Sequence, residues 1–158
     1  MAGALAARPH YQQPDIAVYS ADGQLQMAVV LTKQTGATPK WAGEFRRNLL
    51  ENAVVANTRF FLIALPDHLF LWCRAASAAD VELPDYDVDP ARYLRPYVDD
   101  DPRLSGKLSR NGLHLAVAAW LDDLLWYGPG PDAVPPEDRW LLDSGLYPAI
   151  WGGKTISS

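Results

Sequence analysis

Two short apolar runs near the start of the chain predict a β-hairpin. Residues 16–19 (IAVY) and residues 25–32 (LQMAVVLT) are rich in β-favouring side chains, and Asp22 and Gly23 lie between them. An Asp-Gly pair between two such runs is a strong short-range hairpin signal, because these residues adopt the backbone conformation of a tight turn. We therefore expect two antiparallel strands joined by this turn.

The next part of the chain predicts a helix followed by a pair of strands. Apolar residues recur every three or four positions, which places them on one face of a helix of about four turns; they are Trp41, Phe45, Leu49, Ala53 and Ala56. Residues 59–65 (RFFLIAL) and 69–73 (LFLWC) then read as strands, the first of them covered on both faces. This order predicts an α/β fold, a mixed sheet built from a hairpin, a crossover helix and a strand pair.

Charge is concentrated in the middle of the chain. Residues 80–102 contain eight acidic and two basic side chains together with four prolines, and the net charge of −5 originates here. A proline-rich acidic segment is typical of a solvated linker on the surface. We therefore assign residues 80–106 to a linker that follows an α/β core of residues 1–79.

The remainder, residues 107–158, is predicted to be a helical extension. Leu113, Val117, Leu121 and Leu124 have the spacing of a buried helical stripe, and glycines and prolines from position 128 end it. Residues 137–146 predict a second, shorter helix. Because fewer than about 60 residues make a marginal core alone, we expect this extension to pack on the sheet, within a single domain overall.

Composition excludes several classes of protein. The chain has 158 residues, 49% of them hydrophobic, and one cysteine, which is a globular composition without an internal disulfide. The acidic balance excludes a wholly basic nucleic-acid coat, although a local basic face is still possible. The apolar runs are far shorter than the roughly 20 residues that span a bilayer, and no secretory signal is visible. We therefore expect a cytoplasmic protein with no membrane partner.

Two polar residues at the base of the hairpin suggest a family. Pro14 and Asp15 open the first strand and Lys33 closes the second, so both side chains can lie at one end of the sheet, close enough to share one ligand. With the order of elements over residues 12–73, this arrangement resembles the PD-(D/E)XK nuclease superfamily, in particular an uncharacterised bacterial branch of it. The resemblance implies a restriction-endonuclease-like fold and Mg²⁺-dependent hydrolysis of DNA. In it Asp15 is a metal ligand, and Lys33 positions or polarises the attacking water.

The sequence departs from the family pattern at the second acid. The (D/E)-x-K triplet reads Leu31-Thr32-Lys33, whereas Mg²⁺ requires several oxygen ligands. Glu44, on the helix that follows, is the candidate to replace the missing acid as the second metal ligand, and with Asp15 and Lys33 it completes the set of candidate catalytic residues. The segment before Asp15 is also short for the helix with which family members begin, so a protein partner or a second copy of the chain could supply that cover.

Basic residues of the predicted helix form the densest basic patch. Lys40, Arg46 and Arg47 lie close in sequence, and the functional interpretation is contact with nucleic-acid phosphates. The alternative is a solvated helix face paired with Glu44 and Glu51.

Three hypotheses on function follow from these residues. Leu31 favours a degenerate nuclease-like protein, weak or inactive in DNA hydrolysis, that acts as a nucleic-acid-binding or assembly module. The alternative is an active Mg²⁺-dependent DNA endonuclease in which Glu44 replaces the missing ligand. A third possibility is an unrelated α/β protein, which would apply if residues 12–73 did not form a hairpin flanking the helix.

Overall fold

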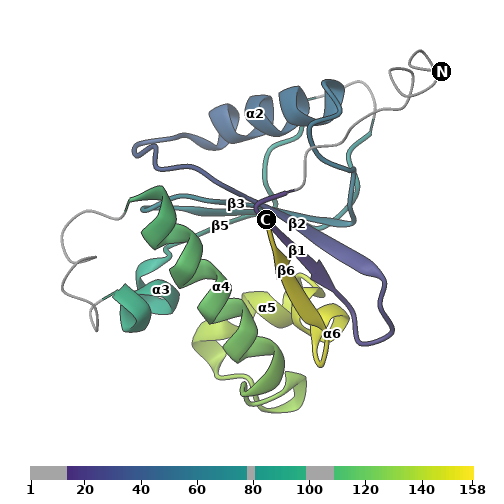
Figure 1. Ribbon diagram of the computed structural model, residues 1–158, viewed down its shortest axis with the longest axis vertical. Helices are drawn as coiled ribbons and strands as arrows, with labels where there is room; N and C mark the ends of the chain where they lie inside the picture. Colours follow the sequence, from purple (N-terminus) through teal and green to yellow (C-terminus); the bar gives the residue numbers. More distant parts are fainter. Residues whose placement is uncertain (1–13, 78–80, 99–108) are drawn as a thin grey trace.

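The fold is α/β, with helices on both faces of one six-stranded mixed sheet (Figure 1). The computed structural model describes residues 14–77, 81–98 and 109–158. The strands are β1 Ile16–Tyr19, β2 Leu25–Leu31, β3 Phe60–Ala64, β4 Leu69–Trp72, β5 Tyr86–Val88 and β6 Lys154–Ser157. The α-helices are α2 Pro39–Glu51, α3 Ala91–Val98, α4 Arg110–Trp126, α5 Trp140–Asp143 and α6 Leu146–Ile150, and short 3₁₀ turns occupy Pro131–Ala133 and Pro136–Asp138.

The sheet has the strand order β5-β4-β3-β2-β1-β6. β1 and β2 form the predicted antiparallel hairpin, with Ile16 opposite Val29, and Gly23 in its turn adopts a φ of 86°. β2 and β3 run parallel and are joined by α2, whereas β3 and β4 are antiparallel. The predicted mixed sheet, with a hairpin, a crossover helix and a strand pair, is therefore confirmed.

α2 covers one face of the sheet and begins where its sequence predicts. The Thr38 hydroxyl caps it by accepting the N–H of Trp41 at 3.1 Å, and Pro39 occupies the first turn. The helix is shorter than expected, since it ends at Glu51 and Ala53 has a φ of 52°. The buried face is also rotated from the predicted one. Its buried residues are Ala42, Gly43 and Arg46. The two small residues, Ala42 and Gly43, let the helix approach the large aromatic side chains of β3 and β4.

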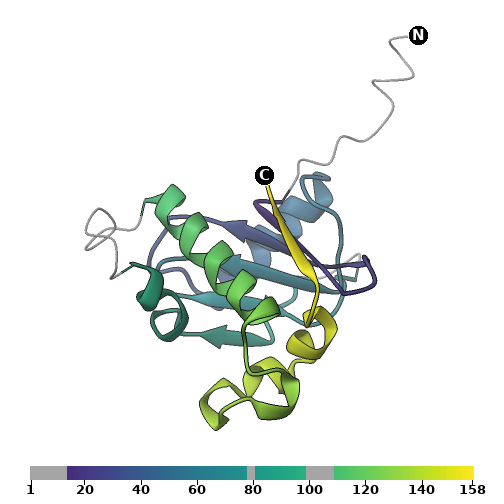
Figure 2. The ribbon, with the colours of Figure 1, turned by 60° about the horizontal axis from the view of Figure 1, so that its bottom comes forward.

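The other face of the sheet is covered by α3, α4, α5 and α6 (Figure 1). α4 crosses this face (Figure 2) and buries Leu113, Val117 and Leu121 against Val18, Leu62 and other strand residues. This long helix is confirmed. The single helix expected over residues 137–146 is wrong, because Gly145, at a φ of 80°, separates the short helices α5 and α6. β6, which pairs with β1, was not expected.

The interpretation of residues 80–106 as a linker is wrong for most of the segment's described residues. β5 pairs antiparallel with β4, and Leu94 of α3 is buried in the core. The acidic side chains concealed this pattern, because they alternate with the partly buried Tyr86 and Val88 along an edge strand. The rest of the segment, residues 80 and 99–106, lies outside the described residues.

Within residues 14–77, 81–98 and 109–158, none of the helices combines the length and the apolar character needed to cross a membrane.

Candidate functional site

The residues that carry the nuclease resemblance lie at the end of the sheet where β2 ends. Leu31, the last residue of β2, is paired with Ala64 of β3, and Asp15 directly precedes β1 beside it. α2 starts a few residues after β2, and α4 starts at Arg110, which contacts Asp15. Two helices therefore begin at this sheet end, one from each face, so the positive ends of their dipoles lie near it.

The Asp15 carboxylate is held by two donors. One oxygen, Oδ2, accepts the backbone N–H of Leu31 at 2.7 Å. The other, Oδ1, accepts a hydrogen bond from the Arg110 guanidinium, and the side chains of Asp15 and Arg110 are 18% and 50% exposed. The backbone of β2 therefore orients the carboxylate, and the guanidinium of Arg110 on α4 neutralises its charge.

Lys33 follows β2 at the same sheet end, and its side chain is exposed. In the ranges that the structure describes, no hydrogen bond or ion pair joins Lys33 to Asp15 or to another residue. Leu31 contributes its peptide N–H, while the residue as a whole is 4% exposed and its side chain packs in the core. A carboxylate introduced at position 31 would therefore lie in a buried apolar environment. The sharing of one ligand by Asp15 and Lys33 stays a prediction.

In the part of the chain that the structure describes, no contact joins Glu44 to Asp15. Glu44 lies on the exposed side of α2, which covers the face of the sheet opposite to α4, whereas Asp15 is tied to α4 through Arg110 (Figure 1). Across the described ranges, no three His, Cys, Asp or Glu side chains come together in a group that could hold a metal ion. The two carboxylates predicted to bind Mg²⁺ therefore belong to different layers of the fold.

A second polar pair lies at this sheet end, two strands away from β2. His68 Nδ1 is 2.7 Å from Asp87 Oδ1, and the imidazole stacks on Phe70 with ring centroids 4.9 Å apart. The preceding Asp67 accepts the N–H of Gly36 at 2.9 Å. This last bond ties the loop before α2 to the turn between β3 and β4.

The three residues of the predicted basic patch do not all lie on the surface of the protein. Lys40 is exposed in the first turn of α2. Arg47 is 48% exposed and forms an ion pair with Glu51 at 2.9 Å, as the alternative interpretation expected. The placement of Arg46 in an exposed patch is wrong, since its side chain is 3% exposed. The helix is rotated so that this arginine points toward the sheet.

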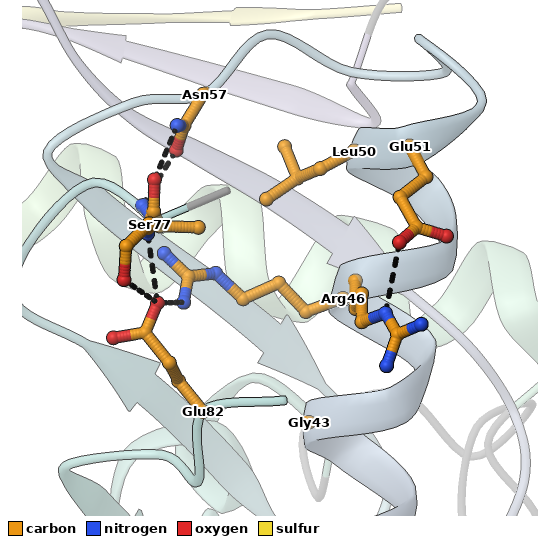
Figure 3. A pocket seen from close by; sticks show the side chains of 9 residues that line it. Gly43, Arg46, Leu50, Glu51, Asn57, Ser77 and Glu82 are labelled. Carbon is orange, nitrogen blue, oxygen red and sulfur yellow. Dashed lines mark hydrogen bonds and ion pairs between the residues drawn. The ribbon is translucent and has the colours of Figure 1, made fainter. Parts of the chain in front are cut away.

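Arg46 instead lines a cavity of about 290 Å³ at the opposite end of the sheet (Figure 3). Its guanidinium carbon lies 5.0 Å from the Trp72 ring and 5.5 Å from the Phe61 ring, a pair of residues at the start of β3 and the end of β4. Burial lowers the pKa of Arg46, and the nearby Glu82 and Asp85 carboxylates partly oppose that effect.

Sequence reasoning did not identify Arg110 or the partners of Arg46. Ser109 is a recognisable helix cap, but no local signal connects it with Asp15, 95 residues before Arg110. Glu82 was missed because it lies in the segment that we interpreted as a linker.

Comparisons of this chain with protein-family models, with curated proteins and with solved structures found no match.

Proposed function

We propose that this chain is a degenerate PD-(D/E)XK nuclease-like protein that binds nucleic acid with little or no hydrolysis. The observation that carries the proposal is the state of Asp15, whose carboxylate is occupied by the Leu31 N–H and the Arg110 guanidinium. The order of hairpin, crossover helix and parallel strand supports the restriction-endonuclease-like part of the proposal.

The residues present do not fit a magnesium site. Mg²⁺ is a hard cation that takes oxygen ligands in an octahedron. Here Asp15 is already neutralised by Arg110, position 31 offers a buried hydrocarbon side chain, and Glu44 lies in another layer. This arrangement favours binding over hydrolysis, and it does not favour the alternative in which Glu44 completes an active endonuclease.

Positive charge at the same sheet end supports contact with phosphates. Lys33 and Lys40 are exposed there, Arg110 is half exposed, and the N-termini of α2 and α4 add partial positive charge. Since the whole chain carries a net charge of −5, we expect weak, non-specific binding that falls steeply with salt.

A DNA-binding and cleavage assay on the full chain tests the proposal. We expect labelled single- or double-stranded DNA to bind at low salt and to stay intact with Mg²⁺ present. Replacing both lysines, Lys33→Gln with Lys40→Gln, should weaken binding several-fold and reduce the salt slope by about one unit per lysine. Lys154→Gln is the matched control, because this exposed lysine lies at the far end of β1, opposite Tyr19.

Three results would contradict the proposal. If DNA does not bind at low ionic strength, or if Lys154→Gln weakens it as much as the double variant, this sheet end does not bind nucleic acid. If the wild type cleaves DNA strongly with Mg²⁺, and both Asp15→Asn and Glu44→Gln abolish cleavage, the active-endonuclease alternative is correct.

A further inference from the structure

The ion pair between Arg110 and Asp15 joins two side chains that are held unequally. Asp15 is fixed twice, because its Oδ2 accepts the Leu31 N–H at 2.7 Å and its backbone carbonyl accepts the Ser158 N–H at 3.0 Å. The Arg110 side chain is 50% exposed, and among the described residues its one partner is the Asp15 carboxylate. When the pair separates, Asp15 therefore stays in place and the guanidinium moves.

The Arg110 guanidinium has unused donors for a second anion. A guanidinium carries five N–H donors in a planar fork, whereas the contact with Asp15 involves a single nitrogen, Nη2. A pair of arginine and phosphate is frequently bidentate and charge-assisted, but a partly exposed ion pair between side chains adds little net stability. A phosphate group can therefore replace Asp15 as the partner of Arg110 at small cost.

The surroundings of this ion pair favour an incoming anion. Lys33 and Lys40 are exposed at the same end of the sheet, and the N-termini of α2 and α4 lie there as well. Two further carboxylates of this end, Asp67 and Asp87, are each within hydrogen-bond distance of another neighbour. Asp15 is thus the carboxylate placed to compete with a phosphate for the guanidinium.

We propose that Asp15 is a built-in competitor of phosphate at this site. In the free protein its carboxylate occupies Arg110, and a nucleic-acid phosphate displaces it when the chain binds. This inference rests on the proposed function and adds an autoinhibitory contact to the same site. It makes Arg110 an exchangeable phosphate ligand, and it makes Asp15 a group that weakens binding.

Asp15→Asn keeps one contact of the carboxylate and removes the other. The Leu31 N–H requires the single amide oxygen, so the amide NH₂ faces Arg110 and cannot accept a hydrogen bond from it. The guanidinium is then released. DNA at low salt should bind to this variant of the full chain about fivefold more tightly than to the wild type.

Asp143→Asn is the matched control. It also removes the carboxylate partner of an exposed arginine, Arg139. This pair lies on and beside α5, which is followed by Gly145 near Phe60, at the opposite end of the sheet from Asp15. At the same salt concentration, this control should change the DNA affinity by less than about twofold.

Arg110→Gln completes a double-mutant cycle with Asp15→Asn. It should cost the Asp15→Asn variant several-fold more DNA affinity than it costs the wild type, because the wild-type arginine is already occupied by Asp15. A purely long-range effect of charge would instead lower both affinities by the same factor. Thermal unfolding of each variant, followed by circular dichroism, verifies that it is folded.

A second readout does not require DNA. Inorganic phosphate is titrated into the ¹⁵N-labelled full chain, and the Arg110 Nε–H signal is assigned with Arg110→Lys. We expect a saturable shift of this signal in the wild type, and saturation at about fivefold lower phosphate in Asp15→Asn. The Arg139 Nε–H signal is the internal control and should not saturate in the same range. The wild-type titration does not depend on the folding of any variant.

The outcomes separate this inference from the proposed function. DNA binding that depends on Lys33 and Lys40, with no gain in Asp15→Asn or with equal losses from Arg110→Gln in both backgrounds, would overturn the competition alone. The absence of a phosphate shift at Arg110 would overturn it as well. A phosphate shift that tightens in Asp15→Asn, without DNA binding by either protein, would support the exchange and overturn the nucleic-acid function.

Discussion

Cys73, directly after β4, has its thiol in an environment that favours the protonated form. Burial is the main cause, and the neighbouring Asp85 carboxylate adds to it, so that the pKa of Cys73 is raised to about 11. Asp85 is held in place by accepting the Cys73 backbone N–H at 2.8 Å. The thiolate, which is the reactive form, is therefore scarce at neutral pH.

This environment predicts slow alkylation of Cys73. At pH 8 the reaction with iodoacetamide should be on the order of a hundredfold slower than for a free thiol of pKa about 8.5. Because the folded pKa is raised, the rate should keep increasing above pH 9, where a free thiol levels off. Asp85→Asn should shift the profile to lower pH, whereas Asp87→Asn should not, since that exposed carboxylate does not contribute to the shift. A wild-type rate that levels off near pH 9 would contradict this prediction.

At the level of elements, α2 carries a glycine in its middle because another segment crosses it. A Cβ atom at position 43 would lie 2.7 Å from the Glu82 carbonyl oxygen and 3.0 Å from a methyl group of Val81. The same carbonyl accepts the Trp72 indole N–H, so the crossing segment is fixed from both sides. This contact outweighs the cost of a mid-helix glycine, which is about 1 kcal/mol relative to alanine.

Gly43→Ala should therefore destabilise the protein, although alanine has a higher helix propensity than glycine. We expect a loss of roughly 1–3 kcal/mol in the free energy of unfolding, because the backbone of residue 82 must move. Glu44→Ala, one residue further on the exposed side of α2, should change stability by less than about 0.5 kcal/mol. Urea unfolding measures both. If Gly43→Ala stabilises the protein, the crossing segment does not rest on α2.

At the scale of the whole molecule, the C-terminal helices and the strands share one hydrophobic cluster. Met27 and Leu62 of the sheet pack in it with Leu121 of α4 and Tyr147 of α6. β6, close to the C-terminus, then pairs with β1 at the edge of the sheet. Removing the C-terminal half would expose this sheet face and this edge together.

A fragment of residues 1–79 should accordingly fail to fold. We expect a far-ultraviolet circular dichroism spectrum without a cooperative thermal transition, whereas the full chain should unfold cooperatively. A fragment that unfolds cooperatively with the stability of the full chain would show that residues 1–79 have a core of their own.

The elements that the sequence predicted are those with local signals. Asp22 and Gly23 specify the hairpin turn, Thr38 and Pro39 begin α2, and continuous apolar runs mark β3 and β4. At the candidate site, the same local reasoning placed Asp15 beside the end of β2. These signals are readable because each depends on the backbone preferences and burial of neighbouring residues.

Tertiary structure alone decided the partners of these elements. β5 and β6 are edge strands without a fully buried residue, so no apolar run marks them, and they form because β4 and β1 offer unpaired edges. The rotation of α2 buried Arg46, and the docking of α4 brought Arg110 to Asp15 across 95 residues of sequence. Such pairings depend on how whole elements pack. Packing brings together residues that are far apart in sequence, and no local sequence pattern indicates that they will be in contact.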